Sequence, residues 1–332
     1  MVDEALGSGR PDIRARTSPA AEGTVRAAGS TAAPYGFSVR YAPADLAGQW
    51  HDVVTLDDGR VGVLIGCCTD PAIAPGMRSA ARSALLETAD PVRSLDCVTG
   101  NSVSAVCAVI DDATIGYSGH GDANTAIATP DAASCTQGPA VQHANGRLVV
   151  APLAPGATVL LCTGQIGPAA AVLVGCEAMH PEQVADQVID RLGSGIATML
   201  YRHPPVPLTV TLAAHPAGLA VSRGRLRRWL AAAGVDAESS ADILLAVGEA
   251  TANATEHAVV GADHDVAITV TATITGSRLR LTVCDDGVWK PPPASSGHRG
   301  HGIPLINALV DSAELTTTPE GTTVEMVKEL RP

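Results

Sequence analysis

Residues 249–257 read Glu-Ala-Thr-Ala-Asn-Ala-Thr-Glu-His and belong to a longer helical pattern. At about 100° per residue, Glu249, Asn253 and Glu256 fall in one narrow sector of that helix. Apolar residues occupy the opposite side, so a carboxylate and a carboxamide share one polar face. The solvated face of an amphipathic helix has the same appearance, and this stretch therefore needs support from the rest of the chain.

Two further stretches supply that support. A predicted strand over 279–283 runs directly into Asp285-Asp286-Gly287, a carboxylate followed by a glycine that lets a ligand approach the backbone. Gly297-His-Arg-Gly-His-Gly302 stands immediately before a predicted helix over 303–311. Glycines leave backbone N–H groups accessible there, and a helix N-terminus attracts phosphate. Each stretch alone is an everyday turn, but the three in this order indicate a nucleotide site.

These stretches resemble the motifs of the GHKL ATPases. Residues 249–257 resemble the N box, Asp285–Gly287 the first glycine box, Gly300–Gly302 the second, and Gly321–Val324 the terminal G-T-x-V. Over roughly residues 208–330 the similarity is greatest to the RsbW-type anti-sigma-factor serine kinases. The resemblance implies a Bergerat α/β sandwich that binds ATP and Mg²⁺.

The resemblance also implies a role for each matching residue. Glu249 would be the general base, Asn253 the Mg²⁺ ligand, Asp285 the acceptor for the adenine amino group, and Thr323 a support for the adenine end. The other expected nucleotide-binding residues are His257, Gly287, Arg299, Gly300, Gly302 and Thr322. These residue types suit their roles. Mg²⁺ bound to ATP needs only one or two protein oxygens, and an ionised carboxylate can only accept a hydrogen bond, as the adenine amino group requires. The same glutamate can activate a serine hydroxyl or a water, and the sequence leaves both uses open.

Residues 41–200 resemble a SpoIIE-like (PPM-type) serine phosphatase domain through eroded motifs. The matching segments are Ala47–Asp52, Gly66–Cys68, Tyr117–His120, Leu153–Gly156 and Cys162–Gln165. Where that family's pattern carries metal-binding acids, this chain has Gln49, Cys67, Gly164 and the Ser194-Gly195 pair. A two-metal centre needs converging carboxylates, so we expect a pseudophosphatase.

Two alternative metal sites remain open in this region. Asp52 and Asp70 survive near the eroded motifs and would allow a shifted metal site. The adjacent Cys67 and Cys68 are soft ligands that His51 could join, although small buried core residues explain them better. The eight cysteines form no C-x-x-C pair, which argues against a zinc ribbon.

Composition limits the remaining possibilities. A chain of 332 residues suggests two compact domains, and 34 acidic against 22 basic residues disfavour direct nucleic-acid binding. Glycines and a proline interrupt the uncharged run over 157–176, so no membrane span is expected, and no secretory signal is visible.

We expect a cytoplasmic α+β protein with two α/β sandwiches. The predicted divisions are a disordered tail (1–36), a PPM-type domain (37–202), a Pro-rich linker (203–207) and a GHKL domain (208–332).

The pattern of apolar residues predicts most of the individual elements. Helices are expected over 77–86, 181–192, 217–233, 239–259 and 303–311. Strands are expected over 53–56, 61–65, 103–110, 114–117, 148–150, 159–162, 196–200, 266–274 and 279–283, with a last hairpin turning at 319–321.

The combined features predict a Mg-ATP-dependent serine kinase and anti-sigma regulator. Its expected partner is an anti-anti-sigma (STAS) protein, with a sigma factor as a further candidate and a homodimer as the expected assembly. Two other functions fit the sequence. One is a non-catalytic switch that binds ATP or a partner, and the other is an active SpoIIE-family phosphatase with an altered metal site.

Overall fold

The computed structural model describes residues 25–26, 35–42, 48–129, 140–142, 146–176, 179–193, 195–257, 265–287, 302–318 and 321–331. Most of the predicted tail lies outside these ranges. Within it, Val25–Arg26 forms a two-residue strand, β1, that pairs antiparallel with β2. The free backbone edge of β2 explains this short addition. None of the helices in these ranges has both the length and the apolarity needed to cross a bilayer.

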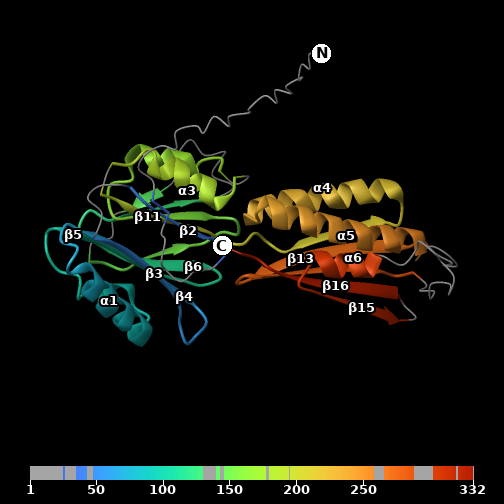
Figure 1. Cartoon of the computed structure of the whole chain (residues 1–332), viewed down its shortest axis with the longest axis horizontal. Coiled ribbons are helices and arrows are strands. Elements are labelled where there is room, and N and C mark those ends of the chain that lie inside the picture. The colour runs from blue at the N-terminus through green and yellow to red at the C-terminus, as the bar shows by residue number, and fades with distance from the viewer. Residues whose placement is uncertain are drawn as a thin grey trace, which may run out of the picture.

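Two sheets packed face to face form the N-terminal unit (Figure 1). The first sheet has the order β1, β2 (Phe37–Tyr41), β11 (Ala197–Arg202), β10 (Thr158–Cys162), β7 (Asn124–Ala128) and β8 (Ala140–Gln142). The second has the order β3 (Gln49–Thr55), β4 (Val61–Cys68), β5 (Val103–Ile110), β6 (Thr114–His120) and β9 (Val149–Pro152). All of these pairings are antiparallel, and short turns join β3 to β4 and β5 to β6.

Alternating side chains place one apolar core between these sheets. Val39 and Met199 from the first sheet pack with Ile65 and Tyr117 from the second. Helices α1 (Ala74–Thr88) and α2 (Pro91–Leu95) cover the outer face of the second sheet, while the 3-10 helix η2 (Gly167–Leu173) and helix α3 (Pro181–Ile189) cover that of the first. The unit is therefore an α/β sandwich, as predicted, and it has four layers.

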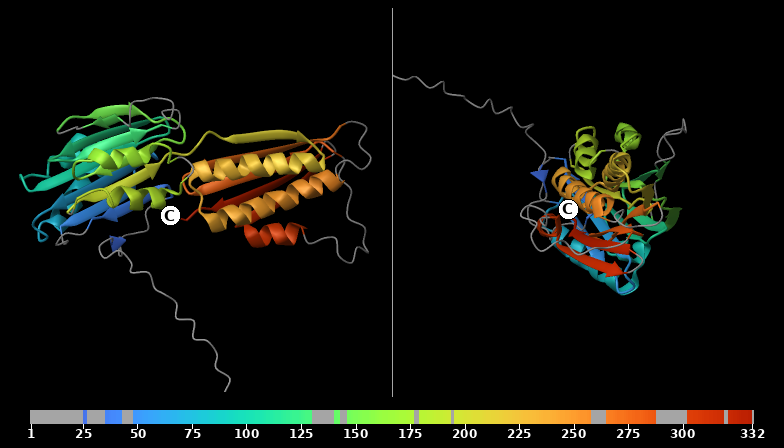
Figure 2. Two further views of the ribbon diagram at one scale, coloured as in Figure 1. Left: turned by 90° about the horizontal axis from the view of Figure 1, so that it is seen from above. Right: turned by 90° about the vertical axis from the view of Figure 1, so that its right-hand side faces the viewer.

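The C-terminal unit is a single sheet with helices on one face (Figures 1 and 2). The strand order is β12 (Leu208–Ala213), β13 (Ala267–Thr275), β14 (Arg278–Asp285), β16 (Gly321–Glu329) and β15 (Ser312–Thr318). The helices are α4 (Pro216–Ala233), α5 (Ala237–His257) and α6 (Gly302–Leu309). Leu230 and Ile243 from the helices pack on Val270, Leu281 and Met326 from the sheet, which confirms the predicted α/β sandwich.

Threonine side chains cover much of the sheet face without helices. Along β13 the buried Ile268, Val270 and Ala272 alternate with threonines. Two cross-strand hydroxyl pairs lie on this face, Thr271 with Thr282 at 2.6 Å and Thr211 with Thr269 at 3.1 Å. β-Branched threonine favours strand geometry while its hydroxyl satisfies the solvated side.

Several strands were not predicted from the sequence. β2, β7 and β12 are short, and β2 and β7 are buried on both faces, so neither shows the alternation on which the predictions relied. Helix α5 begins at Ala237, slightly earlier than expected, because the Asp236 side chain accepts the Ser239 amide at 2.9 Å.

The residues between the two units are held at both ends. The His203 amide donates to the Ala157 carbonyl at 2.8 Å, and the Pro204 carbonyl accepts from Gly156 at 3.1 Å. On the other side, the Trp229 indole donates to the Val206 carbonyl at 2.7 Å. Residues 203–207 belong to no helix or strand, and hydrogen bonds to both units hold them.

Three histidines make stability sensitive to acid, of which His51 and His203 are buried and His180 is half-buried. Burial lowers the pKa of His51, His180 and His203 below the ordinary value of 6.5. The unfolded chain therefore binds more protons just below neutrality, and stability is lost as the pH falls through 6.5 towards the lowered values. Between pH 7.5 and 5.5 we expect the melting temperature of the N-terminal unit to drop by roughly 3–5 °C.

A substitution at His180 separates this effect from the titration of carboxylates. The His180 ring accepts the Glu182 amide at 3.3 Å and so caps α3. Asparagine caps a helix equally well and does not titrate. Calorimetric melting of His180→Asn should therefore show a weaker acid dependence than the wild type, and an unchanged dependence would contradict the assignment.

Candidate functional site

Helix α5 presents the predicted polar face beside the C-terminal sheet. Ile243, Val247 and Ala254 are buried in the core, whereas Glu249 and Asn253 are half-buried on the other side. Glu256 is exposed at the end of the same stripe. The helical geometry predicted from the sequence thus leaves the carboxylate and the carboxamide one turn apart and accessible.

The start of helix α6 meets these two side chains. A methyl group added at Gly302 would lie 2.6 Å from Nδ2 of Asn253 and 3.0 Å from Oε1 of Glu249. Only a glycine lets the helix N-terminus approach this closely. The structure therefore brings together the N box and the last glycine of the second glycine box, which are about 50 residues apart in the sequence.

Asp285 lies at the end of β14 and is only 6% exposed. Burial raises the pKa of its carboxyl, and backbone hydrogen bonds from Gly287 and Thr322 oppose that rise. The Gly287 amide donates to Oδ1 at 3.1 Å and so fixes the orientation of the carboxylate. A buried acceptor held in this way can select a hydrogen-bond donor on a ligand.

Gly321 allows β16 to start against the backbone of β14. Its φ is +146°, and a methyl group there would lie 1.9 Å from the Asp285 carbonyl oxygen. Both the conformation and the close approach require glycine. Residue 321 therefore sets the position of the strand that carries Asp285.

The structure corrects the expected role of Thr323. Asp285 is the register partner of Thr322, while Thr323 is opposite Cys284 and its hydroxyl donates to that thiol at 3.4 Å. Because successive strand residues face opposite sides, Thr323 points to the face without helices. Thr322 lies on the same side as Asp285, so it is the residue that can support a nucleotide there.

Some predicted site residues cannot be placed. Arg299 and Gly300 lie outside the described residues. For His257 the backbone is described as the last residue of α5, but its side chain is not.

The chemistry of the described residues fits a nucleotide with its metal ion. Asn253 provides an amide group, Asp285 a buried acceptor, and the N-terminus of α6 lies next to Asn253 and Glu249. Mg²⁺ bound to ATP needs only one or two protein oxygens, and the N-terminal amides of α6 favour phosphate. Asn253 would hold the cation, and α6 would face the phosphates.

In the N-terminal unit, the positions at which the phosphatase pattern carries metal-binding acids also lie close together. Gln49 and Cys67 are register partners on the face between the sheets. The Gln49 amide donates to the Ile196 carbonyl at 3.2 Å, and the Cys67 thiol donates to the Gly195 carbonyl at 3.0 Å. A methyl group at Gly164 would lie 2.8 Å from Cδ1 of Ile196. An apolar side chain and neutral groups therefore meet where the phosphatase pattern expects acids.

A hollow of about 570 Å³ opens at this place. Most of its lining is thiol, hydroxyl, amide and glycine, and Asp122 is the one carboxylate among the described lining residues. No group of three or more His, Cys, Asp or Glu able to hold a metal ion occurs among the residues the structure describes. Hard divalent ions prefer several carboxylates, so these residues do not fit a two-metal centre.

The two alternative metal sites also disagree with the geometry. Both oxygens of the buried Asp52 accept from arginines of α1, Arg78 at 3.2 Å and Arg82 at 2.6 Å. Asp52 therefore faces α1, away from the hollow. Cys67 and Cys68 are consecutive on β4 and point to opposite sides, so they cannot bind one ion with His51. Asp70 is exposed and accepts the Ala72 amide at 2.9 Å.

Comparison with known proteins agrees with this two-part organisation. The family model of the histidine kinase-like ATPase domain matches residues 212–328. The crystal structure of the RsbU and RsbW domains of Rv1364c from Mycobacterium tuberculosis is 22% identical, with a TM-score of 0.54 over 91% of this chain and 97% of that one.

Two further structures match about half of this chain more loosely. The PP2C phosphatase domain of SpoIIE from Bacillus subtilis, with a fragment of its regulatory domain, is 12% identical and covers 52% of this chain and 62% of that one, at a TM-score of 0.41. RsbX in complex with magnesium is 11% identical and covers 50% of this chain and 94% of that one, at 0.38. The chain thus shares the two-domain fold of the RsbU and RsbW domains of Rv1364c, and its residues 212–328 match the histidine kinase-like ATPase domain.

Proposed function

We propose that the chain is a Mg-ATP-dependent serine kinase and anti-sigma regulator that acts on a STAS protein, with a pseudophosphatase domain. The match to the ATPase family supports ATP binding. The observation that carries the proposal is the meeting of Glu249, Asn253 and Gly302, with Asp285 at the neighbouring strand end. A sigma factor and a second copy of the chain are further proposed partners. The proposed domains are 37–202 and 208–332, joined by 203–207.

Each described residue has a definite task in this proposal. Asp285 accepts the adenine amino group, and Thr322 lies on the same side of the sheet. Asn253 holds the cation, which when bound with ATP supplies charge stabilisation for phosphoryl transfer. Glu249, one turn from Asn253, takes the proton from the incoming serine hydroxyl. These roles use the accessible side of α5 and leave its apolar side to the core.

Labelled ATP distinguishes the kinase from a switch that only binds. With Mg²⁺ and candidate STAS proteins, Glu249→Gln should lose at least about 100-fold in transfer of label, because the general base is removed. Its affinity for ATP, measured by calorimetry, should stay within about threefold. Glu256→Gln is the matched control, since Glu256 lies in the same sector but is exposed, and it should transfer label normally.

The outcomes separate the candidate functions. Equal transfer by Glu249→Gln and the wild type would remove the general-base assignment. Binding of ATP without transfer to any candidate would favour the non-catalytic switch. No binding of Mg-ATP by the wild type would remove the proposal as a whole.

The pseudophosphatase part rests on the neutral groups around Ile196. We expect no Mn²⁺-dependent release of phosphate from a phosphoserine protein, and no saturable Mn²⁺ binding by the full chain at micromolar concentration. Calorimetry with Mn²⁺ and a phosphate-release assay check both expectations. Release that requires Mn²⁺ would instead support an active phosphatase with an altered metal site.

A further inference from the structure

Helix α4 ends with a full set of hydrogen-bond partners. The last four carbonyls of an α-helix have no partner within the helix. In α4 the carbonyls of Leu230 and Ala231 accept from the backbone after Gly234 has turned the chain with a φ of +76°. The other two carbonyls, those of Ala232 and Ala233, accept from side chains outside the helix.

Arg202 of the N-terminal unit supplies one of these side chains, and Tyr35, which lies two residues before β2 in the predicted tail, supplies the other. Nη1 of Arg202 lies 3.5 Å from the Ala232 carbonyl, and the Tyr35 hydroxyl donates to the Ala233 carbonyl at 2.5 Å. Arg202 is the last residue of β11 and is 2% exposed, and its Nη2 donates to the Cys176 carbonyl at 3.0 Å. A buried cation at a helix C-terminus is favoured by the helix dipole. One guanidinium therefore ties the N-terminal unit to the end of α4.

The turn after α4 carries this contact into α5. A methyl group at Gly234 would lie 2.8 Å from Cδ of Pro181, the first residue of α3, so the turn packs directly on the N-terminal unit. Two residues later Asp236 caps α5. α5 is a continuous helix of 21 residues and carries Glu249 and Asn253. The N-terminal unit therefore holds the hairpin from which the proposed ATP-binding side chains project.

We propose that Arg202 is a positioning residue for the ATP site, because it fixes the α4–α5 hairpin against the N-terminal unit. This inference rests on the proposed function. Strand β11 also starts beside the hollow, since Ile196 lines it and the Ala197 amide donates to the Thr163 hydroxyl at 2.9 Å. A conformational change at the hollow would therefore be transmitted to the proposed ATP site through β11 and the α4–α5 hairpin.

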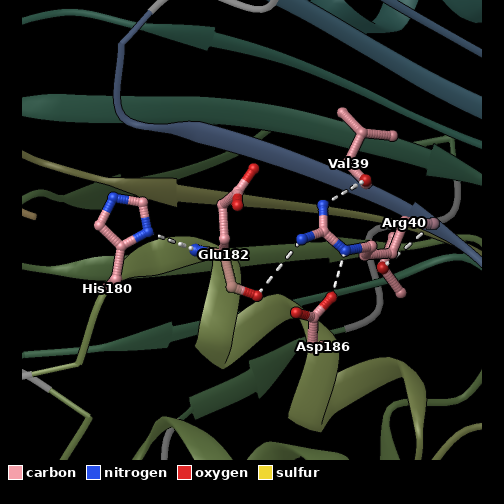
Figure 3. Close-up of polar contacts among 6 residues, drawn as sticks. Val39, Arg40, His180, Glu182 and Asp186 are labelled. Carbon is pink, nitrogen blue, oxygen red and sulfur yellow. Dashed lines mark hydrogen bonds and ion pairs between the residues drawn. The ribbon is translucent and has the colours of Figure 1, made fainter. Parts of the chain in front are cut away.

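A buried arginine on the neighbouring strand provides a matched control. Arg40 in β2 is 3% exposed and lies on the same side of the first sheet, the side covered by α3. Its guanidinium pairs with Asp186 at 2.5 Å and lies 3.5 Å from the Glu182 carbonyl, so its partners all belong to the N-terminal unit (Figure 3). Arg40→Met removes a buried charge of the same kind without touching α4.

The experiment compares full-length wild type with Arg202→Met, Arg202→Lys, Tyr35→Phe and Arg40→Met. Hydrogen exchange is followed in peptides that cover residues 228–240, and Mg-ATP affinity is measured by calorimetry. We expect Arg202→Met to speed exchange there at least tenfold and to raise the Kd for Mg-ATP at least fivefold. Arg202→Lys should give intermediate values of the exchange rate and of the Kd. Tyr35→Phe should raise both quantities, and Arg40→Met should change neither quantity.

Each result decides between the inference and the proposed function. If wild type binds Mg-ATP and Arg202→Met binds it equally well, the positioning role is wrong while the proposed function stands. Equal effects of Arg202→Met and Arg40→Met would show a general loss of stability and would also overturn it. If Arg202→Met does not fold, Tyr35→Phe decides, because it removes only a hydroxyl. Failure of the wild type to bind Mg-ATP would remove both.

Discussion

Gly321→Ala is expected to separate strands β14 and β16 of the C-terminal sheet. We expect it to lower the free energy of unfolding of the C-terminal unit by about 3–5 kcal/mol. The added methyl group would lie 1.9 Å from the Asp285 carbonyl oxygen, and the residue would keep a φ of +146°. The obstructing atom belongs to the backbone of β14 and cannot rotate away. Hydrogen exchange of the β14 and β16 amides in increasing urea measures the loss.

Gly276→Ala is the matched control for this substitution. Gly276 also has a positive φ, +59°, and lies in the turn between β13 and β14, but nothing is within 4 Å of an added methyl group. Only the backbone conformation opposes alanine there, so we expect a cost of about 1 kcal/mol. Similar costs at the two positions would show that the close approach to Asp285 contributes little.

Gly302→Ala is expected to leave the fold intact and to lower the proposed phosphoryl transfer by about 100-fold, since small displacements of reacting groups have effects of that size. The methyl group would push on Nδ2 of Asn253 at 2.6 Å and on Oε1 of Glu249 at 3.0 Å. Both atoms are at the ends of side chains that can rotate, so the substitution should displace these two groups without disturbing the backbone. Calorimetric Mg-ATP binding, label transfer and a melting curve on the same preparation check this expectation.

Gly248→Ala tests whether the effect is specific. Gly248 precedes Glu249 in α5, and an added methyl group there meets nothing within 4 Å. Alanine is the better helix former by about 1 kcal/mol, so the variant should melt higher and keep its activity. Equal loss of activity in the two variants would mean that the approach of α6 to Asn253 has no special role.

The helices of the C-terminal unit could be predicted because their signals are local. Gly234 ends α4, and the apolar spacing of Ile243 and Val247 places the buried side of α5. The polar stripe with Glu249 and Asn253 follows directly from that periodicity. These features depend on neighbours within one or two turns, which a single sequence displays.

Contacts between distant segments could not be predicted in the same way. Thr322 and Thr323 are adjacent and chemically identical, and only the pairing with β14 decides which one faces Asp285. A one-residue change of register would exchange their roles. The convergence of Gln49, Cys67 and Gly164 was inferred from a resemblance, whereas the neutral partners that occupy it, such as the Ile196 carbonyl, required the pairing of both sheets.

The attachment of residues 203–207 to both units affects how the protein should be divided for experiments. A fragment that starts at Leu208 would lack the Val206 carbonyl that accepts from Trp229, together with the arginine and tyrosine that complete α4. A fragment that stops at Arg202 would expose a buried guanidinium at its new carboxyl end. Assays on separate halves would therefore characterise two altered molecules, and their activities would not add up to the behaviour of the intact chain.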